Sequence, residues 1–158
     1  RIAKSGNGIV VKGIHDVAVR FSKCCSPVPG DEIVGFVTRG RGMSIHRTDC
    51  VNVINLSAAE RSRLITAEWE DPGDTEEGGQ YLAELKLYAD DRRGLLLDIT
   101  KVFTEEKIDV KSMNTRTSKK GTATMDMGFI VHGREELNRV IKKLRQIENV
   151  IDIERTTG

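Results

Sequence analysis

Four residues of the kinds that bind metal ions lie close together near the start of this chain. All three cysteines fall in this stretch, Cys24, Cys25 and Cys50, and His46 stands four residues before the last of them. Thiolate sulfur and imidazole nitrogen are the ligands that zinc prefers, and four of them complete a tetrahedron. Because four protein ligands leave no open position for a substrate, the set predicts a structural zinc site rather than a catalytic one.

The adjacency of Cys24 and Cys25 is unusual for a metal site, whose paired ligands are ordinarily separated by two to four residues. Neighbouring residues of a strand point to opposite faces, so both thiols can reach one ion only if the chain turns here. Ser26-Pro27 is typical of such a turn. Two other interpretations stay open: buried cysteines beside a surface histidine, or adjacent thiols with a redox role.

The cysteine content also bears on the compartment. Three cysteines cannot all pair, and a disulfide between adjacent cysteines would close a strained small ring. We therefore expect free thiols, a reducing environment and a cytoplasmic location. No apolar run approaches the roughly 18–20 residues of a membrane span, and no signal peptide is seen. Because the chain starts at Arg1 without methionine, we expect it to be a piece of a longer protein.

Positive charge gathers in the same region as the cysteines. Residues 1–56 hold eight Lys and Arg against four Asp and Glu, a net charge of +4. Residues 57–80 hold two against seven (−5), and residues 81–158 hold fifteen against thirteen (+2). Arg39 and Arg41 flank a glycine between two expected strands, a shape that can approach a phosphate backbone closely. Together with Lys23 and Arg47 they form a candidate RNA contact, and the alternative is an ordinary solvated surface.

The charge pattern and the turn formers divide the chain into two modules. Residues 1–70 form the first, an acidic glycine-rich stretch at 71–80 is the linker, and residues 81–158 form the second. In the first module, alternating apolar residues predict strands at 17–21, 32–38, 43–47 and 64–69, the middle two as a hairpin. Thr48 or Asp49 is expected to cap a short helix ending near Asn55. Ser57 and Glu60 have the spacing of a capping box for a second helical turn.

The second module shows a cleaner periodicity. One strand is indicated by alternation, and two amphipathic helices are indicated by apolar stripes at helical spacing. Strands at 110–117 and 122–131 flank a turn at 118–121, and a last strand covers 150–154. The order β-α-β-β-α-β predicts a ferredoxin-like sheet with both helices on one face, so the fold class is α+β. The residues that carry these periods are Ala83, Leu85, Leu87 and Ala89 for the strand, and Leu95, Ile99, Val102, Phe103, Leu137, Val140, Ile141 and Leu144 for the helices.

Two motifs in this order resemble a known family. Cys-Cys-Ser-Pro-Val-Pro-Gly-Asp at 24–31, Gly-Arg-Gly at 40–42 and Ile-His-Arg-Thr-Asp-Cys at 45–50 resemble the conserved-cysteine, zinc-finger-like domain of the RelA/SpoT family. Asp-Asp-Arg-Arg-Gly-Leu-Leu-Leu-Asp-Ile-Thr at 90–100 resembles the first turn of the ACT domain that follows it in that family. Members of the family synthesise and hydrolyse the alarmone (p)ppGpp in the stringent response to amino-acid starvation.

The resemblance implies a regulatory, non-catalytic tail of a GTP pyrophosphokinase or (p)ppGpp hydrolase. Its partners would be the N-terminal catalytic domains and the ribosome, near the tRNA site, with ribosomal RNA facing the basic residues. The alternative function is an ACT module that senses an amino acid and dimerises without touching RNA. This stretch of sequence does not distinguish a synthetase from a hydrolase or a bifunctional parent.

ACT domains often bind an amino acid at the turn into their first helix, across a dimer interface. By resemblance, the ligand-binding residues here would be Asp91, Arg93, Gly94, Leu95 and Asn114. Free helix amides at such a turn can receive a carboxylate. Many ACT turns of metabolic enzymes have proline where Arg93 stands, which favours the alternative of a simple helix start.

The sheet order also matches an RNA-recognition motif, a fold that stacks bases on aromatic residues of its central strands. Only Tyr88 and Phe129 stand on the two expected central strands, so base stacking is disfavoured. The sequence leaves open an RNA contact of the second module through charge or shape.

Overall fold

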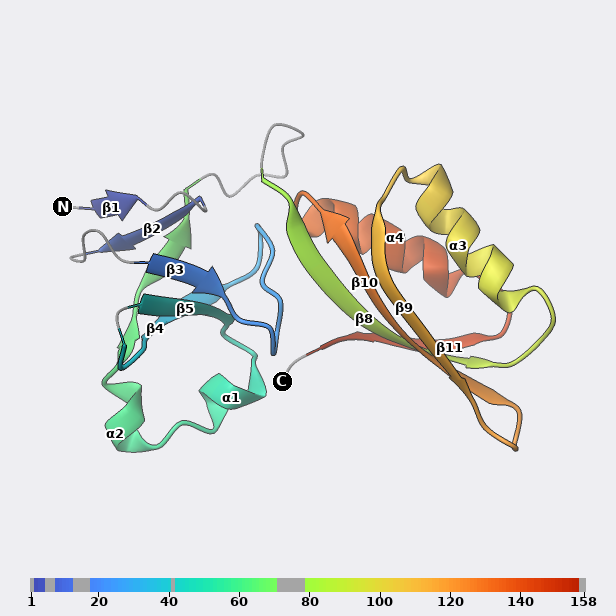
Figure 1. Ribbon diagram of the computed structural model, residues 1–158, viewed down its shortest axis with the longest axis horizontal. Helices are drawn as coiled ribbons and strands as arrows, with labels where there is room; N and C mark the ends of the chain where they lie inside the picture. Colours follow the sequence, from blue (N-terminus) through green and yellow to red (C-terminus); the bar gives the residue numbers. More distant parts are fainter. Residues whose placement is uncertain (1, 5–7, 13–17, 41, 71–78, 157–158) are drawn as a thin grey trace.

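The computed structural model describes residues 2–4, 8–12, 18–40, 42–70 and 79–156. Figure 1 shows a strand-rich body formed by the first part of the chain beside a body in which two helices cover a sheet. The predicted α+β class is confirmed. Most of the stretch expected to be a linker, residues 71–78, lies outside the described residues. No helix in the described ranges is long and apolar enough to cross a membrane.

The first module is built from two small sheets. One has the strand order β1-β2-β7, formed by Ile2–Lys4, Ile9–Lys12 and Ala67–Trp69. The other has the order β3-β5-β4-β6, formed by Ala18–Phe21, Gly42–Arg47, Ile33–Val37 and Leu64–Ile65. The expected hairpin is present, since β4 pairs antiparallel with β5. Strand β3 lies parallel to the other side of β5.

The single strand expected at 64–69 is instead two strands in different sheets. Strand β6 pairs with β4, whereas β7 pairs with β2. This segment therefore carries the chain from one sheet to the other. The alternating burial of Ala67 and Trp69 places both side chains in the core of the module.

Two short helices connect β5 to β6. Helix α1 (Val51–Ile54) is capped by Cys50 without a side-chain hydrogen bond, so the expectation of Thr48 or Asp49 as its cap was wrong. The Asp49 carboxylate is instead held by the guanidinium of Arg47. Helix α2 (Ala58–Arg61) has the predicted capping box: Ser57 Oγ accepts from the Glu60 amide, and the Glu60 carboxylate accepts from the Ser57 amide.

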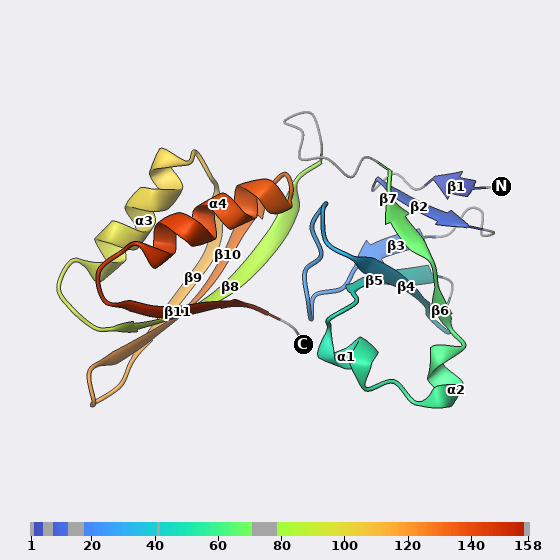
Figure 2. The same ribbon diagram turned by 180° about the vertical axis from the view of Figure 1, so that it is seen from behind.

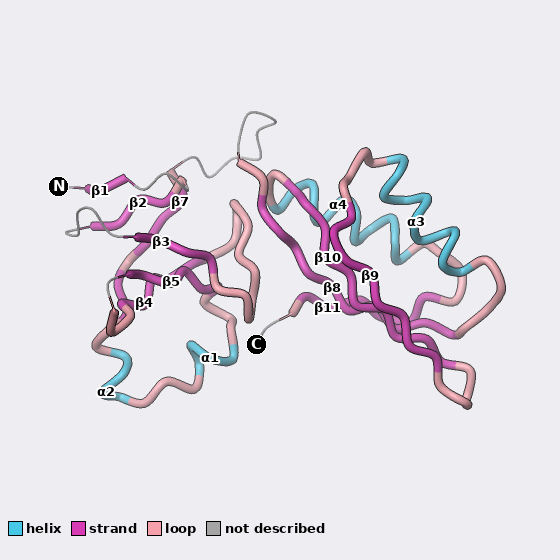
Figure 3. Tube along the Cα trace, viewed as in Figure 1, coloured by secondary structure: helices cyan, strands magenta, loops and turns pink. Residues whose placement is uncertain are grey.

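The second module has the predicted ferredoxin-like topology. Its elements are β8 (Tyr81–Asp90), α3 (Leu95–Glu105), β9 (Val110–Thr117), β10 (Thr122–Val131), α4 (Arg134–Arg145) and β11 (Val150–Arg155). They form an antiparallel sheet with the order β11-β8-β10-β9. Both helices cover the same face of this sheet in Figures 1 and 2, and Figure 3 shows the other face free of helix.

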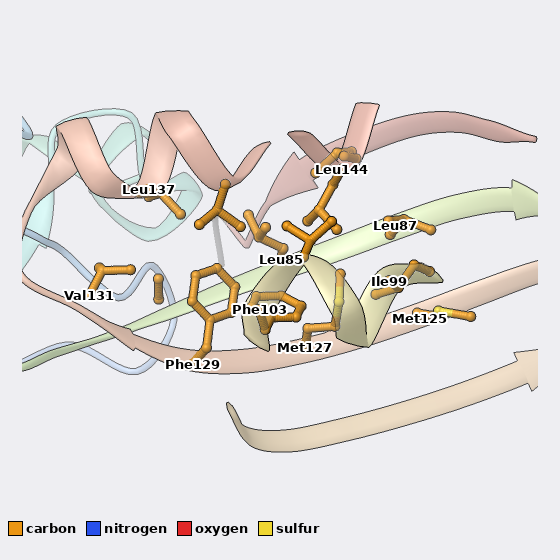
Figure 4. Close-up of a cluster of buried hydrophobic side chains, with 14 of the residues drawn as sticks. Leu85, Leu87, Ile99, Phe103, Met125, Met127, Phe129, Val131, Leu137 and Leu144 are labelled. Atoms are coloured by element: carbon orange, nitrogen blue, oxygen red, sulfur yellow. The ribbon is translucent and has the colours of Figure 1, made fainter. Parts of the chain in front are cut away.

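One continuous core joins the helices to the sheet (Figure 4). Phe103 of α3 and Phe129 of β10 pack with ring centroids 4.9 Å apart. Leu137, Val140 and Leu144 of α4 are fully buried, as the helical stripe predicts. Val28 of the first module, fully buried, belongs to this same core. The two modules therefore share packing.

Candidate metal centre

The four predicted ligands converge in the structure. Their ligand atoms all lie within 4.8 Å of one another, although they come from three separate parts of the first module. Cys24 Sγ lies 3.4 Å from Cys50 Sγ and 3.5 Å from His46 Nδ1. Cys25 Sγ lies 3.9 Å from the same nitrogen. We call these four residues the Cys–His cluster.

A tight turn allows both adjacent cysteines to face this point. The Ser26 amide donates to the Ser22 carbonyl at 3.0 Å, and Ser26 has the left-handed backbone angle φ 46°. The chain therefore turns at Cys24-Cys25, as the adjacency requires, and the turn falls slightly before the expected Ser26-Pro27. His46 comes from strand β5, and Cys50 is the N-cap residue of α1.

Neighbouring polar groups orient the cluster. Ser44 Oγ lies 3.1 Å from His46 Nε2, which leaves Nδ1 to face the three thiols. The Arg47 amide donates to Cys25 Sγ at 3.3 Å, and Ser22 Oγ lies 2.7 Å from Cys24 Sγ. Such outer contacts fix the orientation of metal ligands and tune their basicity.

Burial and hydrogen bonding give the thiols different acidities. Burial raises the pKa of the Cys25 thiol to about 12. Burial also raises the pKa of Cys50. At Cys24 burial opposes ionisation, but hydrogen bonds from Ser22 and Asn52 outweigh it and hold the pKa below its ordinary value. Burial lowers the pKa of His46, which favours the neutral imidazole that coordinates metals.

The geometry fits a tetrahedral ion. With bonds of about 2.3 Å to sulfur and about 2.0–2.1 Å to nitrogen, a tetrahedral zinc site has ligand–ligand edges of roughly 3.5–3.8 Å. The Cys24–Cys50, Cys24–His46 and Cys25–His46 separations of 3.4, 3.5 and 3.9 Å are close to those edges. All three cysteines are free of disulfides. All six separations lie within 4.8 Å, so the Cys–His cluster can hold a metal ion when its more distant ligand atoms move inward.

Of the four residues predicted to contact RNA, the three that the structure describes are not gathered on one surface. Lys23 is exposed beside the Cys–His cluster, whereas Arg39 is exposed at the turn between β4 and β5. Arg41 lies outside the described residues. Arg47 is only 5% exposed, and its guanidinium bonds to Asp49 and to two backbone carbonyls. The structure thus corrects the expectation for Arg47, because its side chain supports the fold instead of facing a partner.

A neighbour of Arg39 was missed by the sequence reasoning. Arg63 places its guanidinium 4.7 Å from the ring centroid of Phe36, and its carbonyl accepts a hydrogen bond of 3.0 Å from the amide of Val37, two residues before Arg39. Arg39 and Arg63 therefore lie at the same end of the second sheet. Their separation of 24 positions in the sequence does not predict this proximity, because it results from the pairing of β4 with β6.

Four of the five residues expected to bind an amino acid lie together in the turn into α3, and the fifth, Asn114, lies on β9. Leu95 is buried in the core, and Gly94 takes the left-handed φ of 82° that starts α3. Asp91 and Arg93 are exposed in the turn. Asn114 lies opposite Asp126 in the register of β9 with β10. Met125 and Met127, on either side of Asp126, are in the core. Because side chains alternate along a strand, Asn114 is on the face away from the helices. The amino-acid site therefore stays a prediction.

The Cys–His cluster and the ferredoxin-like sheet define a protein with a cysteine–histidine module followed by an ACT-type domain. Residues 77–155 match the ACT domain family, and residues 9–70 match the RelA/SpoT RIS domain. The chain is 40% identical over 158 residues to the GTP pyrophosphokinase of Streptomyces coelicolor, covering all of this chain and 18% of that protein. It is 38% identical over 157 residues to the GTP pyrophosphokinase of Escherichia coli K12, covering 99% of this chain and 21% of that protein.

The chain therefore belongs to the RelA/SpoT family and contains an ACT domain. It spans about a fifth of the length of the curated relatives that it matches. Among solved structures, it is similar to the ACT domain of the GTP pyrophosphokinase of Chlorobium tepidum, with 23% identity and a TM-score of 0.45. That match covers 49% of this chain and 99% of that domain.

Proposed function

We propose that this chain is a non-catalytic regulatory part of a cytoplasmic (p)ppGpp synthetase/hydrolase, that its Cys–His cluster holds a structural zinc ion, and that its basic residues dock on ribosomal RNA. The observation that carries the proposal is the convergence of the four ligand atoms within 4.8 Å. A closed set of four protein ligands stabilises a fold but leaves no position for a substrate.

Zinc suits this cluster for chemical reasons. Three soft thiolates and one imidazole select zinc over magnesium or calcium, which prefer oxygen ligands. Among the described residues, the apolar core around the cluster is small: Cys25, Cys50 and Val53 are buried, and Cys24 and Val34 pack against them partly buried. Metal binding would supply the folding free energy that such a small core lacks.

The support for RNA docking comes from Arg39 and Arg63. Arg39 is exposed at the tip of the β4–β5 turn, and Arg63 lies over the partly exposed ring of Phe36. Arginine side chains presented in this way bind phosphate oxygens, and binding that neutralises phosphates weakens as salt is raised. The ribosome would then act by preferring one arrangement of this region, which shifts the equilibrium of the distant catalytic domains.

Ribosome co-sedimentation at low and moderate salt tests the docking. We expect the wild-type chain to pellet at low salt and to be released as salt rises. The double variant Arg39→Glu/Arg63→Glu should stay in the supernatant. The matched control is Lys119→Glu/Lys120→Glu, which makes the same change in net charge on the exposed β9–β10 turn of the other module. Equal pelleting of both double variants would overturn the docking surface.

Metal analysis of the purified chain tests the zinc assignment independently. We expect close to one zinc ion per chain, and Cys50→Ala should lose it. A wild-type chain that holds no zinc after purification with added zinc would overturn this part of the proposal and leave RNA docking to be judged on its own. A chain that neither pellets nor binds zinc would favour the amino-acid-sensing ACT alternative, which a thermal-shift panel of amino acids can examine.

A further inference from the structure

The loop that provides two of the four metal ligands is also the part of the first module that enters the second. We call residues 24–31 the ligand loop. Residues 25–29 are buried, and Val28 belongs to the core of the ACT domain. The Pro29 carbonyl accepts a hydrogen bond of 2.7 Å from the amide of Arg134, at the start of α4. The ligand loop is therefore held on one side by the Cys–His cluster and on the other by the ACT domain.

An ion pair with the last strand of the ACT domain holds the same loop. Arg155 of β11 forms a two-pronged ion pair with Asp31, with Nη1–Oδ1 and Nη2–Oδ2 distances of 2.7 and 2.9 Å. Its Nη2 also donates to the Ser26 carbonyl at 3.2 Å. The Asp31 side chain is only 4% exposed, and its Oδ2 accepts from the Val28 amide at 2.8 Å. A buried carboxylate of this kind depends strongly on its cationic partner.

Arg47 contacts both a predicted metal ligand and the end of the strand that carries Arg155. Its amide donates to Cys25 Sγ at 3.3 Å, and its Nη1 donates to the Cys25 carbonyl at 3.2 Å. The same Nη1 lies 3.2 Å from the Thr156 carbonyl, the residue after Arg155 at the end of β11. One side chain thus contacts both a predicted ligand of the metal and the C-terminal end of the ACT sheet. Its neighbour in sequence, His46, is a second predicted ligand.

From these contacts we propose that Arg155 is a positioning residue for the metal site, and that metal binding in the first module is thermodynamically linked to docking of the ACT domain. This rests on the metal binding proposed above. If β11 separates from the ligand loop, Asp31 loses its ion pair with Arg155 and retains the longer contact of 3.9 Å with Arg134 Nε. The Ser26 carbonyl loses its bond from Arg155, and Arg47 loses its bond to the Thr156 carbonyl. The ligand loop is then free to leave the conformation that brings Cys24 and Cys25 to one point.

The linkage is reciprocal, as every coupling of two binding equilibria must be. A metal ion that holds the ligand loop favours the docked ACT domain, and removal of the metal weakens that docking by the same factor. Any partner of the ACT domain that pulls β11 away from the loop would lower metal affinity. Conversely, metal supply would set how freely the ACT domain can move relative to the first module.

The test measures metal affinity in variants of the ACT domain that touch no ligand. Zinc affinity is measured by competition with a chromophoric chelator, and cobalt(II) is titrated as a spectroscopic probe of tetrahedral thiolate coordination. We expect Arg155→Ala to weaken zinc binding by about 10-fold to 100-fold, the range for outer-contact residues of metal sites. Arg155→Lys keeps a positive charge near Asp31 and should recover part of the affinity. The matched control is Arg116→Ala, which removes an exposed arginine–aspartate pair from the same domain.

Hydrogen exchange measures the effect of metal removal on the docking of the ACT domain. Removing zinc from the wild-type chain should speed exchange of the Arg134 amide, which is bonded to the ligand loop, while amides at the centre of β10 stay protected. Asp31→Asn provides a second variant that retains an acceptor for the Val28 amide, should Arg155→Ala fail to fold. The linkage is overturned if folded Arg155→Ala and Asp31→Asn bind zinc as tightly as the wild-type chain. If the wild-type chain itself binds no zinc, the metal assignment fails and the linkage falls with it.

Discussion

Gly30 of the first module lies directly against Arg134, the first residue of α4 in the ACT domain. A Cβ built on Gly30 would come within 2.8 Å of the Arg134 Cβ, and Gly30 has the left-handed backbone angle φ 102°. Glycine is thus required here both by the backbone conformation and by the close approach of the other module. The contact lies two residues after Val28, where the first module enters the ACT core.

We predict that Gly30→Ala lowers the free energy of unfolding by about 1–3 kcal/mol, because it adds a crowded Cβ at a left-handed position. Urea denaturation followed by Trp69 fluorescence measures this well, since Trp69 is the single tryptophan and its Nε1 donates to the Asp31 carbonyl. The control is Gly40→Ala, which has no atom within 4 Å of its new Cβ and should change stability by less than about 0.5 kcal/mol. Equal effects of the two substitutions would mean that the modules do not meet at Gly30.

Ser44→Ala tests how the imidazole is oriented. Ser44 is buried and its hydroxyl lies 3.1 Å from His46 Nε2. Without that partner the ring is free to rotate away from the cysteines, so we expect zinc affinity to fall by about 10-fold to 100-fold while the fold persists. Competition with a chromophoric chelator gives the affinity. Ser112→Ala, an exposed serine of β9, should bind zinc like the wild-type chain. Unchanged affinity in Ser44→Ala would argue against His46 as a ligand through Nδ1.

The ACT domain could be predicted from sequence because the apolar residues of its strands and helices recur with the period of a strand or of a helix. Ala83, Leu85, Leu87 and Ala89 alternate along β8, and all four are buried as expected. The helical stripes predicted both helices in the same way. The convergence of Cys24, Cys25, His46 and Cys50 was also predicted, because thiolate and imidazole are the ligands that zinc prefers and four of them complete a tetrahedron.

The junction between the modules could not be predicted in this manner. Arg155 and Asp31 are 124 positions apart, and a charged residue near a chain end has no periodic signal that distinguishes a buried ion pair from an exposed surface. Arg47 was misinterpreted for the same reason: its charge suggested a phosphate contact, whereas the surrounding carbonyls and Asp49 satisfy it inside the fold. Short strands also lack a period, so the division of 64–69 between two sheets left no trace in the sequence.

Two leucines of α3 provide a matched test of the ACT core. Leu95 is 2% exposed and packs in the core, whereas Leu97 is 70% exposed on the same helix. We expect Leu95→Ala to cost about 2–5 kcal/mol through lost burial and the cavity left behind. Leu97→Ala should cost less than about 0.5 kcal/mol. Far-UV circular dichroism during urea unfolding measures both. A large loss in Leu97→Ala would indicate that this side chain is covered, as it would be in a dimer of the ACT domain.

Tyr81 offers a second way to weaken the junction, this time through its aromatic contacts. At the start of β8 its ring stands edge-on to Trp69 and Phe21 of the first module, with centroid distances of 5.5 and 5.6 Å. Aromatic pairs of this geometry contribute about 0.5–1.5 kcal/mol each beyond the area they bury. We therefore expect Tyr81→Ala to lose about 1–3 kcal/mol from these two pairs.

Tyr81 also packs against the ACT core, but its two aromatic pairs belong to the connection between the modules. In calorimetry, the first module of Tyr81→Ala should unfold at a lower temperature than the ACT domain, giving two separated transitions. Tyr88→Ala is the control, because Tyr88 lies on the open face of the sheet and contacts Glu154 of its own domain. A single sharp transition in Tyr81→Ala at the wild-type temperature would show that the aromatic contacts do not hold the modules together. The packing of Val28, the Pro29–Arg134 hydrogen bond and the ion pair of Arg155 with Asp31 would then be the contacts that hold them together.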